Sequence, residues 1–376
     1  MATLNLLPGH QGPATHAFII GVGNYHHLKP GDAWGLGQLS TAPVSAQRFA
    51  NWLLQRYSDP GRPLASIEHL ISGGTFTDHA NVVHASEEPE LARIEAAYTQ
   101  WFERANRHPD NLALFYFCGH GLCNSRGSTL LAADFADPRF QRTSRNAIHV
   151  EGTANAMLAC KAKYQCFFLD CCRTTDLEWQ NIMEEPGQPL GTARSTDLTA
   201  AHQPMFFAAG RTEAATGVAA DVTVFTKALI EALDGMAAVE PDGDLDAQSW
   251  RVNTGSIAAA IDSAIAVERH QKPHIPELHC HFGGNGAHFD LNYPHLPLSI
   301  PVVVGCDPEH LTGQAQFRLE HGERGEVGRR DARAGLWISR QEPSTYHASA
   351  SVPNNAPQTK TFLLYPPSKR ALLKFP

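Results

Sequence analysis

The 376-residue sequence has no apolar run long enough to span a bilayer, so it predicts no membrane-spanning helix. The segment from Met1 to Pro13 has no basic stretch followed by an apolar core, so we expect no signal peptide and a cytoplasmic location. Positive charge is not in excess either: the formal net charge is −8, whereas nucleic-acid-binding proteins need a basic face. We therefore expect neither a membrane nor a nucleic acid among its partners.

The eight cysteines lack the loop spacings of a disulfide scaffold. Several lie inside apolar, strand-like runs, Cys118 and Cys166 among them, which indicates reduced thiols and agrees with a cytosolic setting. Hydrophobic residues make up 43% of the chain, which is enough to bury a large core and argues against disorder over most of its length.

Short apolar runs alternate with helical patterns along most of the chain. The strand-like runs are 16–22, 66–71, 112–118, 165–169 and 204–209, and 288–291 is expected to close the sheet. The helical patterns cover 44–55, 91–105, 155–161 and 224–233. This alternation predicts an α/β fold, with a mostly parallel sheet covered by helices on both faces.

The residue pattern changes after a Pro-rich stretch at 293–301. Beyond it, short strand-like runs are separated by Gly, Pro, Asn and Asp, as in a β-sandwich. We expect an N-terminal extension over 1–14, an α/β domain over 15–296 and a small all-β domain over 297–376.

Two predicted strands end in residues suited to nucleophilic catalysis. One ends in Phe117-Cys118-Gly119-His120-Gly121, and the other in Leu169-Asp170-Cys171-Cys172-Arg173. Catalytic groups of α/β sheets gather at the carboxyl ends of strands. A thiol nucleophile needs a nearby base, and the oxyanion that forms needs backbone N–H donors, which Gly121 and Cys172 could supply.

Together these motifs resemble the paired signatures of the caspase-like cysteine peptidases, which include caspases, metacaspases and paracaspases. The histidine of that family lies roughly 50 residues before its cysteine, and here the difference is 172 − 120 = 52. The segments 20–25 and 130–134 are also similar to the family, and the resemblance covers roughly residues 15–292. It implies a caspase-hemoglobinase-like sheet with Cys172, the third residue of Asp-x-Cys, as nucleophile and His120 as base, and it requires no cofactor or metal.

The resemblance also implies a substrate class. Metacaspases and paracaspases carry Asp at the position of Asp170 and cleave after Arg or Lys, so we expect protein or peptide substrates with a basic residue before the scissile bond. A buried carboxylate would pair with a guanidinium in a bidentate manner. The second acid of paracaspases has no match within 42–47, and Glu213, in the loop after the fifth predicted strand, is the candidate to replace it. Asp170 as a structural cap and Glu213 as a structural residue stay open as alternatives.

Caspase-like enzymes are often cut after the nucleophile, which implies a zymogen, an activating protease and a role in bacterial death or defence responses. Arg194 is the basic residue in the matching loop and is the predicted processing site, against the alternative of a plain solvated arginine. Two further hypotheses are a catalytically silent caspase-fold binding protein and a metalloprotein. The metal hypothesis would use one of two clusters of possible ligands. These are Cys118, His120 and Cys123 with Cys171 and Cys172 as partners, or His270, His274, His279 and His281 with Cys280 among them.

Overall fold

The structure is a computed structural model that describes residues 3–29, 35–124, 127–140, 143–171, 187–192, 201–208, 221–240 and 249–376. The chain forms two compact units. The first comprises Met1–Lys227 and Leu278–Phe289, and the second comprises Ala228–Glu277 and Asp290–Pro376. In the described ranges, no helix is both long and apolar enough to cross a membrane.

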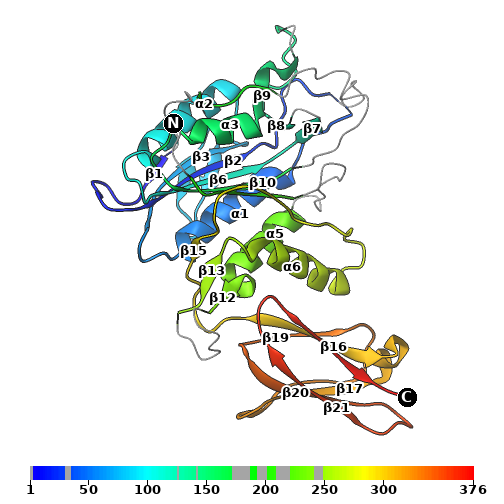
Figure 1. Cartoon of the computed structure of the whole chain (residues 1–376). Coiled ribbons are helices and arrows are strands. Elements are labelled where there is room, and N and C mark those ends of the chain that lie inside the picture. The colour runs from blue at the N-terminus through cyan, green and yellow to red at the C-terminus, as the bar shows by residue number, and fades with distance from the viewer. Residues whose placement is uncertain are drawn as a thin grey trace. The chain divides into compact units, whose positions relative to one another are not determined.

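A seven-stranded sheet forms the centre of the first unit (Figure 1). Its five inner strands are parallel and its two edge strands are antiparallel to their neighbours. The strand order is β1 (Thr3–Asn5), β3 (Leu64–Ile71), β2 (Thr15–Gly21), β6 (Leu112–Cys118), β10 (Tyr164–Asp170), β11 (Gln203–Phe207) and β14 (His281–Asn285). The mostly parallel α/β sheet predicted from the sequence is thus confirmed.

Helices cover both faces of this sheet, which explains why its inner strands are almost continuously apolar. On one face, α1 (Thr41–Gln55) places Phe49 against Tyr116, with ring centroids 4.5 Å apart. On the other face lie α2 (Leu91–Ala105) and α3 (Val150–Met157), and Trp101 of α2 contacts Phe18 and Phe115. Successive residues of β6 therefore point into two different cores.

Two expectations about element bounds are wrong. The helix expected over 155–161 is α3, which begins earlier, at Val150. The run 288–291 does not close the main sheet; β15 (Asp290–Asn292) pairs with β13 (Arg251–Asn253), which also pairs with β12 (Ala238–Val239). The edge strand is β14, whose two central glycines hide it from a propensity-based reading. Gly284 has φ +98°, and a Cβ there would come within 1.9 Å of the Gln203 carbonyl oxygen.

The smaller elements complete both units. In the first unit, β4 (Thr75–Thr77) pairs with β5 (Val83–Ala85), and β7 (Gly121–Asn124), β8 (Gly127–Leu131) and β9 (Ala147–His149) form a three-stranded sheet. A 3₁₀ turn at Thr143–Asn146 lies between β8 and β9. Helix α5 (Val224–Glu231) continues into a π-helical turn at Ala232–Met236. Helix α6 (Ile257–Gln271) and a 3₁₀ turn at Glu309–Gln314 belong to the second unit.

The part of the second unit after residue 297 consists mainly of strands, as the sequence predicts. One sheet has the order β19 (Trp337–Gln341), β16 (Ile300–Asp307) and β22 (Lys369–Lys374). The other has the order β18 (Gly325–Arg330), β17 (Gln316–His321), β20 (Ser344–Ser351) and β21 (Gln358–Leu364). Buried and exposed residues alternate along β17 and β20, as in a sheet with one covered face. The unit also contains α6, so an independent domain that begins at 297 stays a prediction.

Candidate active site

The two sequence motifs follow adjacent strands of the main sheet. Strand β10 pairs in parallel with β6, and the register sets Asp170 opposite Cys118 at the strand ends. The N–H of Gly119 donates to the Asp170 carbonyl at 3.3 Å, so contact continues one residue further. His120 and Cys172 each follow this last registered pair by two residues. Cys172 itself lies outside the described residues.

His120 is 9% exposed, and its contacts define the tautomer of its ring. Its Nε2 lies 2.7 Å from the carbonyl oxygen of Gly37. A carbonyl only accepts hydrogen bonds, so Nε2 carries the hydrogen and the neutral ring keeps Nδ1 as its acceptor. Burial lowers the pKa of His120, and the hydrogen bond to Gly37 opposes this shift only in part. The ring is therefore a neutral base at neutral pH.

Tyr25 contacts both the backbone and the ring of His120. The backbone N–H of His120 donates to the Tyr25 hydroxyl at 2.6 Å, and the two rings lie 4.8 Å apart. This approach requires the glycine at 119, because a Cβ there would come within 2.9 Å of the Tyr25 hydroxyl oxygen. The Gly-His motif thus serves to admit a tyrosine, a role that the sequence alone did not reveal.

Gln38 fixes the loop that presents the Gly37 carbonyl. Its side-chain oxygen accepts from the Tyr25 N–H at 2.6 Å, and its amide nitrogen donates to the Tyr25 carbonyl at 2.9 Å. The N–H of Leu39 donates to the Gly23 carbonyl at 2.9 Å. The two groups that contact His120 are therefore bound to each other through Gln38. The sequence analysis identified 20–25 as similar to the caspase-like family but assigned no role to Tyr25.

Asp170 is buried in a network of hydroxyl groups. Its Oδ2 accepts from the hydroxyl of Thr226 at 2.6 Å and from the hydroxyl of Thr223. Because Thr226 gives its one hydroxyl hydrogen to Asp170, the Tyr116 hydroxyl, 2.6 Å away, is the donor to Thr226. Ser45 of α1 donates in turn to Thr223 at 3.3 Å.

The carboxyl group of Asp170 has no cationic partner among the described residues. Burial raises its pKa, although the threonine hydroxyls act in the opposite direction. No ion pair to Asp170 forms within the described ranges. A desolvated anion in this state gains more from a cation than a solvated one does. The hydroxyl network also gives Asp170 a structural role, so the capping interpretation and the recognition interpretation are compatible.

The structure describes Gly121 and the cysteines near the site, but not the remaining predicted site residues. Gly121 is buried at the start of β7, directly after His120. Glu213 and Arg194, like Cys172, lie outside the described residues. The neighbouring thiols are poor nucleophiles: burial raises the pKa of Cys118 and of Cys166 well above the ordinary thiol value. Cys171 is 2% exposed and packs in the core cluster with Phe117 and Leu169.

The described side chains form no metal site. Across the described ranges, no three side chains of His, Cys, Asp or Glu converge closely enough to hold an ion. This includes the described members of the two clusters that the metalloprotein hypothesis used.

Comparison with known proteins identifies a matching family. The family model of the caspase domain (peptidase family C14) matches residues 14–281, more than half of the chain. An uncharacterized protein of Sinorhizobium fredii is 29% identical over 210 residues. The match covers 55% of this chain and 59% of that protein, so the chain spans less than two thirds of this relative.

Two solved structures are similar at low identity. A structural-genomics protein from Geobacter sulfurreducens is 14% identical, with a TM-score of 0.43 over 76% of this chain and 99% of that one. Caspase-1 from Spodoptera frugiperda is 13% identical, with a TM-score of 0.41 over 73% of this chain and 89% of that one. Structural similarity at this level carries no argument about activity.

Proposed function

Because this chain belongs to the caspase-domain family of peptidases, we propose that it is a cysteine endopeptidase that cleaves proteins after basic residues, Arg in preference to Lys. The observation that carries the proposal is the state of His120. A buried neutral imidazole, with Nε2 bound to the Gly37 carbonyl and Nδ1 left as acceptor, stands at the carboxyl edge of the sheet beside the strand that leads to Cys172. This is the arrangement that a thiol nucleophile needs.

The dyad assignment is supported by the strand register and by Cys171. Adjacent strands lie about 4.7–4.9 Å apart, and His120 and Cys172 are equally far beyond the pair Cys118–Asp170. Cys171 is packed in the core, and adjacent side chains of an extended chain point in opposite directions. Cys172 is therefore the cysteine of the pair that suits the nucleophile.

The proposed reaction is acyl transfer through a thioester. The Cys172 sulfur attacks the peptide carbonyl carbon, and its proton passes to His120 Nδ1. The N–H groups of Gly121 and Cys172 stabilise the tetrahedral oxyanion. As the C–N bond breaks, the imidazolium protonates the leaving amine. Water then attacks the thioester, releases the carboxylic acid and restores the thiol, so no cofactor is consumed.

Specificity for Arg is supported by the lack of a cationic partner for Asp170 among the described residues. The hydroxyls of Thr223 and Thr226 both donate to its Oδ2, and these described donors are neutral. A substrate guanidinium would supply the missing positive charge and add charge-assisted hydrogen bonds. Glu213 is proposed as a second acid at the same subsite.

Regulation is proposed from the resemblance to caspase-like enzymes. Cleavage at Arg194, by the enzyme itself or by an activating protease, would convert a zymogen into the active form. Such control suits a cytoplasmic enzyme of a bacterial death or defence response.

The test is turnover of fluorogenic peptides that differ only at the residue before the scissile bond. We expect cleavage after Arg and weaker cleavage after Lys, with none after Asp, and loss of all turnover in Cys172→Ala and His120→Ala. An arginine ketone should label the wild type covalently and leave Cys172→Ala unlabelled. A folded protein that neither turns over any peptide nor takes up the label would instead be a catalytically silent binding protein.

A further inference from the structure

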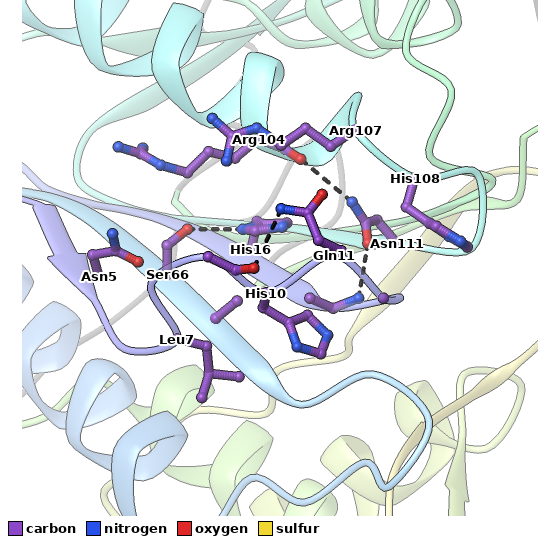
Figure 2. Close-up of a pocket in the computed structure, with 14 residues that line it drawn as sticks. Asn5, Leu7, His10, Gln11, His16, Ser66, Arg104, Arg107, His108 and Asn111 are labelled. Atoms are coloured by element: carbon purple, nitrogen blue, oxygen red, sulfur yellow. Dashed lines mark hydrogen bonds between the residues drawn. The ribbon is translucent and has the colours of Figure 1, made fainter.

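A second candidate site lies in the first unit, at the end of the main sheet opposite to His120. The strands β2 and β3 begin there, and α2 ends there. A cavity of about 200 Å³ opens between these elements and the N-terminal segment, which folds over it with Leu7, His10 and Gln11 (Figure 2). The Leu6 N–H donates to the Ala65 carbonyl at 2.8 Å and fixes this segment to β3.

The lining of the cavity has the opposite sign of charge to the chain as a whole. It contains two arginines and three histidines, namely Arg104, Arg107, His10, His16 and His108, and no Asp or Glu. The whole chain, in contrast, has a formal net charge of −8. The charge of Arg104 is balanced from behind by the buried Glu68, which also accepts from the Thr3 hydroxyl. Arg107 is exposed and has no such partner among the described residues.

His16 is a buried histidine in the lining of the cavity. It is 7% exposed, and Figure 2 shows its ring in the middle of the lining. The pKa of His16 is lowered to about 4, first by burial and then by the positive charges of Arg104, Arg107 and His10. The ring is therefore neutral at pH 7. Its Nδ1 lies 2.9 Å from the Ser66 hydroxyl, and its Nε2 has no hydrogen-bond partner among the described residues.

The helix end explains only part of this arrangement. Basic side chains near the C-terminus of α2 stabilise the helix dipole, and this accounts for the positions of Arg104 and Arg107. It does not account for the N-terminal segment that closes over them with His10. The backbone groups near the helix end are occupied without any ligand, since Asn111 accepts from the Ala14 N–H and donates to the Arg104 and Ala105 carbonyls.

We propose that this cavity binds the phosphate group of a small metabolite. Guanidinium groups bind phosphate in a planar, bidentate manner. No carboxylate lines the cavity, and the Glu68 carboxylate behind it is already paired with Arg104, which leaves Arg107 as the arginine available to an anion. Neutral His16 and Gln11 add uncharged polar groups. The volume is below the roughly 300–1,000 Å³ of sites for drug-sized ligands, so it suits a phosphate group with a small substituent. The site is independent of the proposed peptidase activity.

Titration calorimetry of the full chain with inorganic phosphate, pyrophosphate and a nucleoside monophosphate, at constant ionic strength, tests the proposal. We expect saturable binding of one copy of at least one of these compounds. In Arg107→Gln the Kd should rise about tenfold or more, because a charge-assisted hydrogen bond is lost. Arg93→Gln, on the exposed surface of α2 and outside the cavity lining, is the matched control and should leave the Kd unchanged.

Thermal unfolding adds a readout that does not require measurable heat. A bound phosphate compound should raise the Tm of the wild type and of Arg93→Gln by more than it raises that of Arg107→Gln. Preference for the monophosphate over inorganic phosphate would identify an organic ligand, and the reverse would identify free phosphate. The proposal is overturned if none of the three compounds binds, or if Arg107→Gln binds as tightly as the wild type.

Discussion

Replacement of Asp170 by Asn should stabilise the protein at neutral pH. The substitution removes the buried charge but keeps a side-chain oxygen that can accept from Thr223 and Thr226, as Oδ2 does now. Hydrogen bonds to a charged acceptor contribute about 1.5–3 kcal/mol each, yet the pKa of Asp170 is still raised, so desolvation outweighs them. Each unit by which folding raises the pKa of this carboxyl group lowers the free energy of unfolding at neutral pH by about 1.4 kcal/mol.

The stability gained by Asp170→Asn should increase with pH. The pKa of Asp170 is higher in the folded than in the unfolded state, so its favourable contribution is complete below the unfolded pKa of about 3.9 and is lost as the pH rises through the folded pKa. The difference in Tm between Asp170→Asn and the wild type should therefore be small near pH 3.5 and reach a plateau at higher pH. For a domain of 150–250 residues, a change of about 1 kcal/mol moves the Tm by about 2–4 °C.

Differential scanning calorimetry across this pH range is the assay, and Asp137→Asn is the matched control. The Asp137 carboxylate lies 2.5 Å from Arg139 Nη2, and this pairing lowers the pKa of Asp137 to about 2. The same chemical change should therefore destabilise the protein there at neutral pH. A lower Tm for Asp170→Asn at pH 7.5, or a gain that does not vary with pH, would refute the view that burial raises the pKa of Asp170.

Three further predictions concern the dyad and its surroundings. Tyr25→Phe keeps the ring but leaves the His120 N–H without its acceptor, which should cost about 1–3 kcal/mol of unfolding free energy in a denaturant titration; an unchanged midpoint would contradict the assigned hydrogen bond. Burial lowers the pKa of His120, so the acid limb of kcat/KM in a pH–rate profile should fall below 6.5, and a limb above that value would argue against a neutral buried base. Cys118 and Cys166, whose pKa values are raised by burial, should resist iodoacetamide in the native protein at pH 7.5; mass spectrometry of the alkylated peptides checks this, and rapid labelling of either would count against it.

The sequence predicted those parts of the fold whose side chains carry a strong local pattern. Strand β6 coincides with the predicted run 112–118, and α2 with 91–105, because burial on both faces or on one stripe leaves a clear apolar period. Strand β14 was missed because antiparallel pairing at an edge tolerates His281-Phe282-Gly283-Gly284, which has little strand propensity.

The partners of the site residues were missed for a different reason. His120 was predicted from its flanking glycines, but its contacts come from Tyr25 and Gly37, which are 95 and 83 residues away in the chain. Thr226 lies in α5 and carries no mark in the sequence of its contact with Asp170. Long-range hydrogen bonds between buried polar groups leave no periodic signal, so only the folded backbone reveals them.

The parallel register of β6 and β10 constrains the phase of the two strands but not the number of residues between His120 and Cys172. The two motif positions are 52 residues apart, and the stretch between them includes β7, β8 and β9. The loops that join such elements tolerate insertions, because the entropy of loop closure depends only weakly on loop length. A single residue inserted within either strand would instead invert the direction of every side chain after it. Relatives of this protein should therefore differ freely in the distance between His and Cys along the chain while keeping the phase of the two strands.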